Sequence, residues 1–188
     1  MTASPVTLPG SPTCRVWLSE LPVDYLSVGG SRKDLTVPAT GGTKPSGGAV
    51  QVAIEAYKPA GPRFFFGMLG GSFEPDADID GVRVVVECST DDSPSVSGTL
   101  VGSMDKVHAG IPEWVANVVL QSAKGEIEQY QSIRGTVTLS YGAFGEVSSS
   151  EHVFDYLTRV LFALLDRAAQ TSPLGHDEIT RIVSEHRL

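Results

Sequence analysis

Alternating apolar and polar positions predict several β-strands along the chain. From Val50 to Ala56 every second side chain is apolar, and the pattern stops at the Pro-Ala-Gly-Pro sequence of residues 59–62. A period of two residues is typical of a strand that buries one face. The other runs rich in Val or Phe are short and bounded by glycines, which favours strands over helices. The predicted strands cover residues 14–20, 50–57, 64–66, 82–87, 96–101 and 133–141.

A first helix is predicted over residues 111–124, where apolar side chains gather on one face. Pro112 suits its first turn, because the N–H that proline lacks would have no partner there. Gly125 is a natural stop at the C-terminal end.

The strongest helical pattern follows a predicted turn at residues 142–145. Ser148 and Glu151 fit a capping box, in which each side chain accepts a hydrogen bond from the other residue's backbone N–H. Behind them, apolar residues recur every three or four positions from Val153 to Ala168. The pattern therefore predicts a long helix that ends at residues 172–173.

The order of these elements predicts an α+β fold, in which a mixed sheet is covered on one face by two main helices. Glycine pairs and prolines predict loops at residues 29–30 and 41–48. Residues 1–172 are interpreted as a single domain, and residues 173–188 as a tail with a short amphipathic helix at 177–186.

Composition excludes several classes of protein. The 188 residues carry a net charge of -8, which argues against a general surface for duplex nucleic acid. Cys14 and Cys88 lack the partners of a zinc site, so two buried free thiols are expected. The chain shows no signal-peptide pattern and no apolar run long enough for a membrane, so a cytoplasmic protein without membrane contact is predicted.

Three segments resemble domain IV of translation elongation factor G. They are Ser46-Gly47-Gly48 with Gln51, Gly110 to Trp114, and Thr136 to Leu165, which contains the Val147-Ser148-Ser149-Ser150-Glu151 sequence. The resemblance implies the ribosomal protein S5 domain 2-like fold, with a left-handed β-α-β connection. Residues 58–106 then stand as a β-rich, acidic insertion.

The resemblance also implies an RNA-binding tip, formed where two loops meet at one end of the domain. Gly145 stands where the family carries a histidine, and no phosphate-binding Gly-x-x-x-x-Gly-Lys motif is present, so no GTPase is expected. Two ordinary loops without a ligand are the alternative. The predicted tip residues are Lys44, Ser46, Gly47, Gly48, Gln51, Tyr141, Gly142, Ala143, Phe144 and Gly145.

A calcium loop is the sharpest local motif. Asp76, Asp78 and Asp80 precede Gly81, and Glu87 follows at the spacing that an EF-hand loop requires. Three carboxylates can converge because glycine permits a sharp turn, and the glutamate could close the site. The flanking sequence predicts strands rather than helices, so the alternative is a solvated acidic turn.

No residue pattern supports catalysis, so a non-enzymatic binding module without a cofactor is predicted. The first hypothesis is association with the ribosome or structured RNA through the tip loops. The second is a protein-interaction or oligomerisation module that uses the acidic region, with calcium as its one candidate ligand. The third is an uncharacterised hydrolase.

Overall fold

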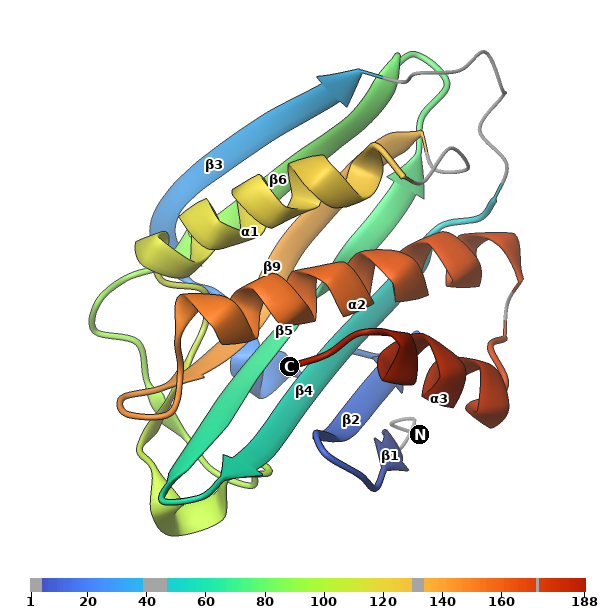
Figure 1. Ribbon diagram of the computed structural model, residues 1–188. Coiled ribbons are helices and arrows are strands. Elements are labelled where there is room, and N and C mark those ends of the chain that lie inside the picture. The colour runs from blue at the N-terminus through green and yellow to red at the C-terminus, as the bar shows by residue number, and fades with distance from the viewer. Residues whose placement is uncertain (1–4, 39–46, 130–133, 172) are drawn as a thin grey trace.

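The computed structural model describes residues 5–38, 47–129, 134–171 and 173–188, which form two layers. One layer is a β-sheet, and helices α1, α2 and α3 lie together on one of its faces (Figure 1). The strands are β1 (Val6–Leu8), β2 (Thr13–Leu18), β3 (Gly29–Pro38), β4 (Val50–Ala60), β5 (Arg63–Pro75), β6 (Gly81–Ser89), β7 (Ser95–Val96), β8 (Val107–Ala109) and β9 (Gly135–Gly145). The helices are α1 (Glu113–Ile127), α2 (Glu151–Gln170) and α3 (His176–Glu185), with 3₁₀ turns η1 (Val23–Tyr25) and η2 (Gly102–Met104) in the connections.

The sheet is mixed, as predicted. Seven strands follow the order β1-β2-β4-β5-β9-β6-β3, and β8 and β7 extend the sheet from the end of β9. Neighbouring strands pair antiparallel except β6 and β9, which run parallel. The ten-residue β3 therefore forms one edge of the sheet, and the three-residue β1 forms the other.

The connection between the parallel strands β6 and β9 passes through α1. When Figure 1 is turned so that both strands point upward with the helices in front, β9 lies to the left of β6. The connection is therefore left-handed, whereas about 98% of such connections are right-handed. Together β4, β5, β6, α1, β9 and α2 follow a β-β-β-α-β-α order.

The main core lies between the helices and the sheet. Gly67 of β5 allows α2 to pack closely, because a Cβ at this position would lie 2.9 Å from side-chain atoms of Val153 and Leu157. The third helix contributes to the same core through three buried side chains, those of Ile179, Ile182 and Val183.

The other face of the sheet carries a smaller apolar cluster, which Tyr25 of η1 and Val101 beside η2 help to close. On this face the carboxylate of Glu55 is fully buried, accepts a 2.6 Å hydrogen bond from the backbone N–H of Leu100 and lies 2.9 Å from Arg15 Nε. Burial raises the pKa of Glu55 to about 6, although the Leu100 hydrogen bond and Arg15 oppose the shift. The hydrogen bond from Leu100 to Glu55 fastens the connection between β7 and η2 to the sheet.

The sequence pattern misses β3. It predicts a loop at Gly29-Gly30 and no strand as far as residue 38, whereas residues 29–38 pair with β6. Only Leu35 and Val37 give this strand an apolar face, because an edge strand buries little of its surface. Two apolar positions are too few to reveal a period of two residues.

Two other expectations about elements are wrong. Residues 142–145 form the end of β9 rather than a turn, and residues 96–101 form a strand only at Val96. Residues 58–106, expected as an insertion, include β5, which lies between β4 and β9, and β6, which pairs with β9.

The predicted capping box at the start of α2 does not form. The helix begins at Glu151 after the N-cap residue Ser150, which makes no side-chain capping hydrogen bond. Ser148 instead donates its hydroxyl hydrogen to the carboxylate of Asp105. A local sequence motif cannot reveal this contact, because Asp105 lies 43 positions away.

The expectations about the two cysteines and the tail helix are confirmed. Cys14 and Cys88 are free and buried, and the tail helix at 177–186 corresponds to α3. Within the described ranges, none of the helices is both long and apolar enough to cross a membrane.

Candidate functional site

The two predicted tip loops lie at opposite ends of the sheet. Val50 at the start of β4 pairs with Phe73 of β5. Phe73 in turn pairs with Val137 near the start of β9. Gly47, Gly48 and Gln51 therefore lie near the start of β9, whereas Gly145 ends that strand. The expected meeting of the loops is wrong, and Lys44 and Ser46 lie outside the described residues.

The segment Tyr141–Gly145, which includes the predicted residues Gly142 and Ala143, is built into the sheet. It pairs with β5 on one side and its end pairs with β8 on the other. Phe144 stacks on the ring of His108, with a centroid distance of 5.4 Å and an angle of 20°. These contacts make the segment a paired strand rather than a projecting loop.

Gly145 is required by its surroundings. A Cβ at this position would lie 2.1 Å from Asp105 Oδ2 and 2.3 Å from Ser148 Oγ. Asp105 also accepts hydrogen bonds from the backbone N–H groups of Val147 and Ser148, at 3.2 and 2.9 Å to Oδ2. The carboxylate therefore fills the space that a side chain at position 145 would need, and it fixes the chain that enters α2.

A small ionic cluster lies beside this loop. Glu146 Oε1 is 2.9 Å from His108 Nε2 and 3.0 Å from Lys106 Nζ, and His108 Nδ1 is 3.0 Å from the carbonyl oxygen of Ser93. Hydrogen bonds from His108 and Lys106 hold the pKa of Glu146 below its usual range. Both basic groups are thus engaged within the protein.

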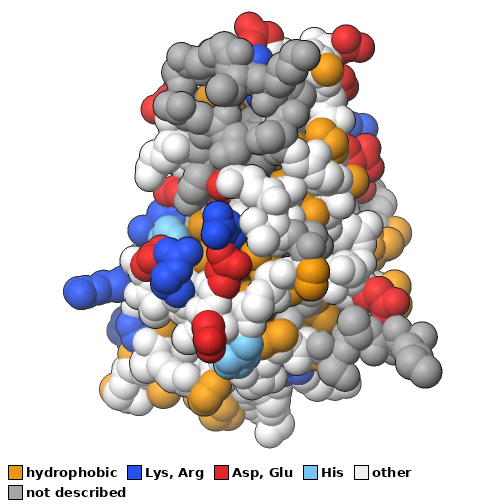
Figure 2. Space-filling model, turned by 90° about the vertical axis from the view of Figure 1, so that its right-hand side faces the viewer, with side chains coloured by type: hydrophobic (Ala, Val, Ile, Leu, Met, Phe, Trp, Pro, Cys, Tyr) orange, Lys and Arg blue, Asp and Glu red, His pale blue; other side chains and the backbone are white. Residues whose placement is uncertain are grey.

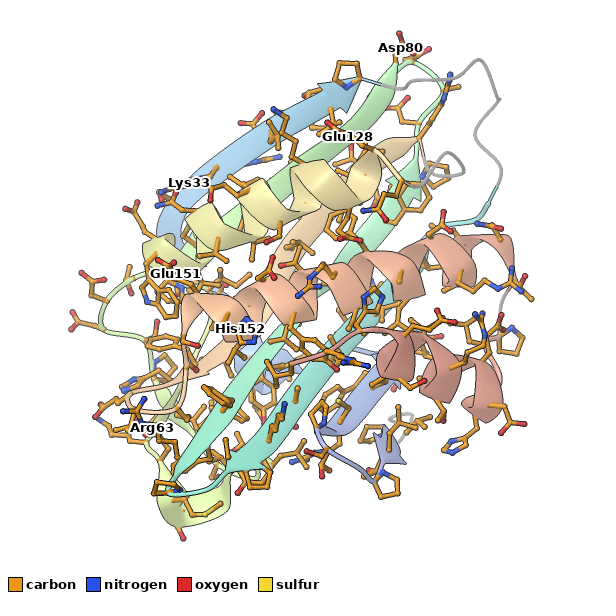
Figure 3. All side chains as sticks on the ribbon, viewed as in Figure 1. Lys33, Arg63, Asp80, Glu128, Glu151 and His152 are labelled. Atoms are coloured by element: carbon orange, nitrogen blue, oxygen red, sulfur yellow. The ribbon has the colours of Figure 1, made fainter. Side chains whose placement is uncertain are left out.

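The four predicted calcium ligands are not brought together. Asp76 Oδ1 accepts a 2.9 Å hydrogen bond from the backbone N–H of Asp78 in the turn before β6. Asp80 is 88% exposed at the tip of this turn (Figure 3), whereas Glu87 lies seven residues farther along the extended chain. At roughly 3.3 Å per residue, Asp80 and Glu87 are roughly 23 Å apart. The EF-hand arrangement therefore does not form, and the described part of the chain contains no cluster of three metal-ligating side chains.

Two buried or partly buried candidate nucleophiles, Cys14 and Ser149, have structural partners. Burial raises the pKa of the Cys14 thiol to about 11, and the Tyr156 hydroxyl lies 3.8 Å from its sulfur. Ser149 donates to the carbonyl of Phe66 and accepts from Gly145 N–H. Neither group has a base that would make it a nucleophile.

Basic side chains do not gather into a patch over α3 and the end of α2. Figure 2 shows them mixed with acidic ones on the half of this view that carries the helices. Arg167 pairs with Glu178, and Arg181 Nη1 lies 2.7 Å from Glu185 Oε1. Most of the positive charge is therefore neutralised locally.

The outer edge of β3 is the longer of the two sheet edges in the described structure. This strand pairs only with β6 within the described ranges, so its other side presents ten residues without a neighbouring strand. A cavity of about 590 Å³ lies beside its second half, between residues 35–38 and the end of α1. Leu35 and Val37 supply apolar walls, and Lys124 of α1 and its C-cap residue Glu128 lie opposite.

Polar contacts close the other half of the boundary between β3 and α1. Lys33 Nζ lies 2.9 Å from Asn117 Oδ1 and 3.8 Å from a Glu113 oxygen, and Ser31 donates a 2.8 Å hydrogen bond to Glu113. Figure 3 shows Lys33 and Glu128 toward opposite ends of this boundary. Along the described part of β3, the groove is therefore open at residues 35–38.

Comparisons of the chain with protein-family models, with curated proteins and with solved structures returned no match.

Proposed function

We propose that this chain is a non-enzymatic protein-interaction module that adds an extended polypeptide segment to its sheet along β3. The observation that carries the proposal is a long unpaired edge strand beside an open groove.

Backbone groups on the outer side of β3 provide the affinity. An edge strand carries N–H and C=O groups that can pair with another extended chain, as in β-strand addition. β1 at the far edge has three residues, against ten in β3. Of these two described edges, β3 is the one long enough to pair with a strand of ordinary length.

Side chains beside the edge provide selectivity. Every second residue of an added strand would face the same side of the sheet as Leu35 and Val37, where the groove lies. A bound segment should therefore carry apolar side chains at alternate positions. Lys124 and Glu128 at the groove can each pair with an opposite charge on that segment.

The test is selection of peptides from a display library, followed by hydrogen exchange of the complex. Selected peptides should alternate apolar and polar residues and should slow exchange of β3 backbone amides. Leu35→Lys should weaken their binding at least tenfold, because it places a charge in the apolar part of the groove. Thr7→Lys on β1 is the matched control, because Thr7 is exposed on the opposite edge of the sheet.

Self-association is a second form of the same interaction. In a twofold antiparallel pair of β3 strands, the central residue lies opposite the same residue of the second copy. A pair centred on Lys33 or on Asp34 would therefore place two like charges opposite each other, which is unfavourable. A pair centred on Leu35 would instead place Asp34 opposite Thr36. Light scattering across a concentration series measures the molar mass in solution. If the chain self-associates in this way, it should form a dimer at high concentration, and Leu35→Lys should abolish that dimer. A monomer at all concentrations, together with no peptide that protects β3, would reject the proposed function.

Association with structured RNA or the ribosome is the second candidate. The β-β-β-α-β-α order and the left-handed connection are what a ribosomal protein S5 domain 2-like fold would have, and they favour this candidate. The separation of the two tip loops and the acidic net charge oppose it. Sedimentation with ribosomes in a salt series is the test, and failure to co-migrate at low salt would exclude it.

A further inference from the structure

A second cavity lies at the end of the sheet that holds the start of β4. Its volume is about 350 Å³, at the lower end of the range of about 300–1,000 Å³ for small-molecule sites. It lies between the end of β2, the start of β4, the end of β5 and the connection from α2 to α3. Phe73, Ala168 and Leu174 are buried and form its apolar floor.

Four polar side chains line the same cavity, namely Ser19, Gln51, Ser72 and Glu74. Unlike the polar groups around Gly145, these four make no side-chain hydrogen bond or ion pair to the described part of the protein. Two hydroxyls, one amide and one carboxylate are therefore available to a ligand. Among the lining residues that the structure describes, none is a lysine, arginine or histidine.

The backbone at Ser19 provides an independent observation. Its φ is +78°, and it is the single non-glycine residue with a positive φ in the described ranges. Its N–H donates a 3.0 Å hydrogen bond to the carbonyl of Gln51, which holds the turn against the start of β4. Strained residues of this kind cluster at ligand sites, and Ser19 lines this cavity.

We propose that this cavity binds a small amphipathic molecule with an apolar body and a hydroxyl or amine head. The body would lie on Phe73, Ala168 and Leu174, and the head would contact Glu74 and the neighbouring amide and hydroxyls. The Glu74 carboxylate has no ion-pair partner among the described residues, which favours a ligand with a neutral or positive head and disfavours a carboxylate or phosphate. The site is separate from the β3 edge, so it stands independently of the proposed function.

The test uses 2-phenylethylamine, 2-phenylethanol and 3-phenylpropanoate, which combine similar apolar bodies with different heads. Two-dimensional NMR of the full chain should show saturable shifts at the amides of Ser19, Gln51 and Leu174 for the amine and the alcohol. Ligands of this size should have a Kd of about 0.1–1 mM. Glu74→Gln should weaken the amine about fivefold and leave the alcohol unchanged.

Ala49→Trp provides the blocking variant, because Ala49 is an exposed residue of the cavity wall. Its large side chain should abolish the saturable shifts without altering the core. Ala60→Trp is the matched control, because Ala60 is exposed at the other end of β4. Equal binding by Ala49→Trp and wild type, or tighter binding of 3-phenylpropanoate than of the amine, would overturn the proposal. Absence of saturable shifts up to 10 mM would also overturn it.

Discussion

At the scale of single residues, Gly145 shows how a distant side chain decides which amino acid a position accepts. The Cβ of an alanine would lie 2.1 Å from Asp105 Oδ2. We expect Gly145→Ala to lower the free energy of unfolding by about 1–3 kcal/mol, because the carboxylate must shift away. Urea denaturation measures the loss. A control needs a glycine whose backbone conformation suits alanine. Gly61 does not qualify, because its φ of +64° is one that alanine rarely adopts.

Asp105 itself gives the next prediction. Asp105→Ala leaves the backbone N–H and the hydroxyl of buried Ser148 without an acceptor. Unfolding free energy should fall by about 1–3 kcal/mol. Asp105→Asn keeps one acceptor oxygen and should lose less. Equal denaturation midpoints for the two variants would contradict this role of the carboxylate.

At the scale of elements, α1 provides a change with the opposite sign. The helix continues through Gly125 to Ile127, although the glycine suggests a stop there. A Cβ at Gly125 meets no atom within 4 Å. Gly125→Ala should therefore raise the free energy of unfolding by about 0.5–1 kcal/mol, because alanine loses less backbone entropy in a helix. Gly125→Ala also serves as the control for Gly145→Ala, because a Cβ has room at Gly125 and clashes with Asp105 at Gly145. If both variants were destabilised, the room available to the Cβ would not explain the change in unfolding free energy.

Elements with a strong local pattern could be predicted from the sequence, and elements defined by distant partners could not. The buried stripe of α2 and the alternation of β4 are both visible in the chain. β3 has only two apolar positions, Leu35 and Val37, and becomes a strand through its pairing with β6. For the same reason the candidate interaction edge was not predicted. Its residues become a site only when the order of the strands is known.

At the scale of the whole molecule, acidic residues 74–92 do not form one surface. Asp76 and Asp80 precede β6, whereas Asp91 and Asp92 follow it. A nine-residue strand spans roughly 30 Å, so the two acidic groups lie at opposite ends of the sheet. The acidic region therefore offers no single patch for a cation or a basic partner, and this directs the search for a partner to the β3 edge.

The pH dependence of overall stability gives the last prediction. The pKa of Glu55 is about 6 in the folded protein and 4.5 without burial, so the folded state holds this proton more tightly. Stability from Glu55 is therefore present below about pH 4.5 and is lost as the pH rises through about 6. The loss amounts to about 2 kcal/mol, because each pKa unit corresponds to about 1.4 kcal/mol.

Wild type alone cannot isolate this effect. Burial lowers the pKa of His186, so that residue makes the protein more stable as the pH rises through the same range. Glu55→Gln keeps an acceptor for Leu100 N–H and leaves His186 in place. We expect the stability of Glu55→Gln relative to wild type to increase by about 2 kcal/mol between pH 4 and pH 7.5. Parallel urea denaturation curves across this range measure the difference, and a constant difference would show that the Glu55 carboxylate is not held in a buried, proton-binding state.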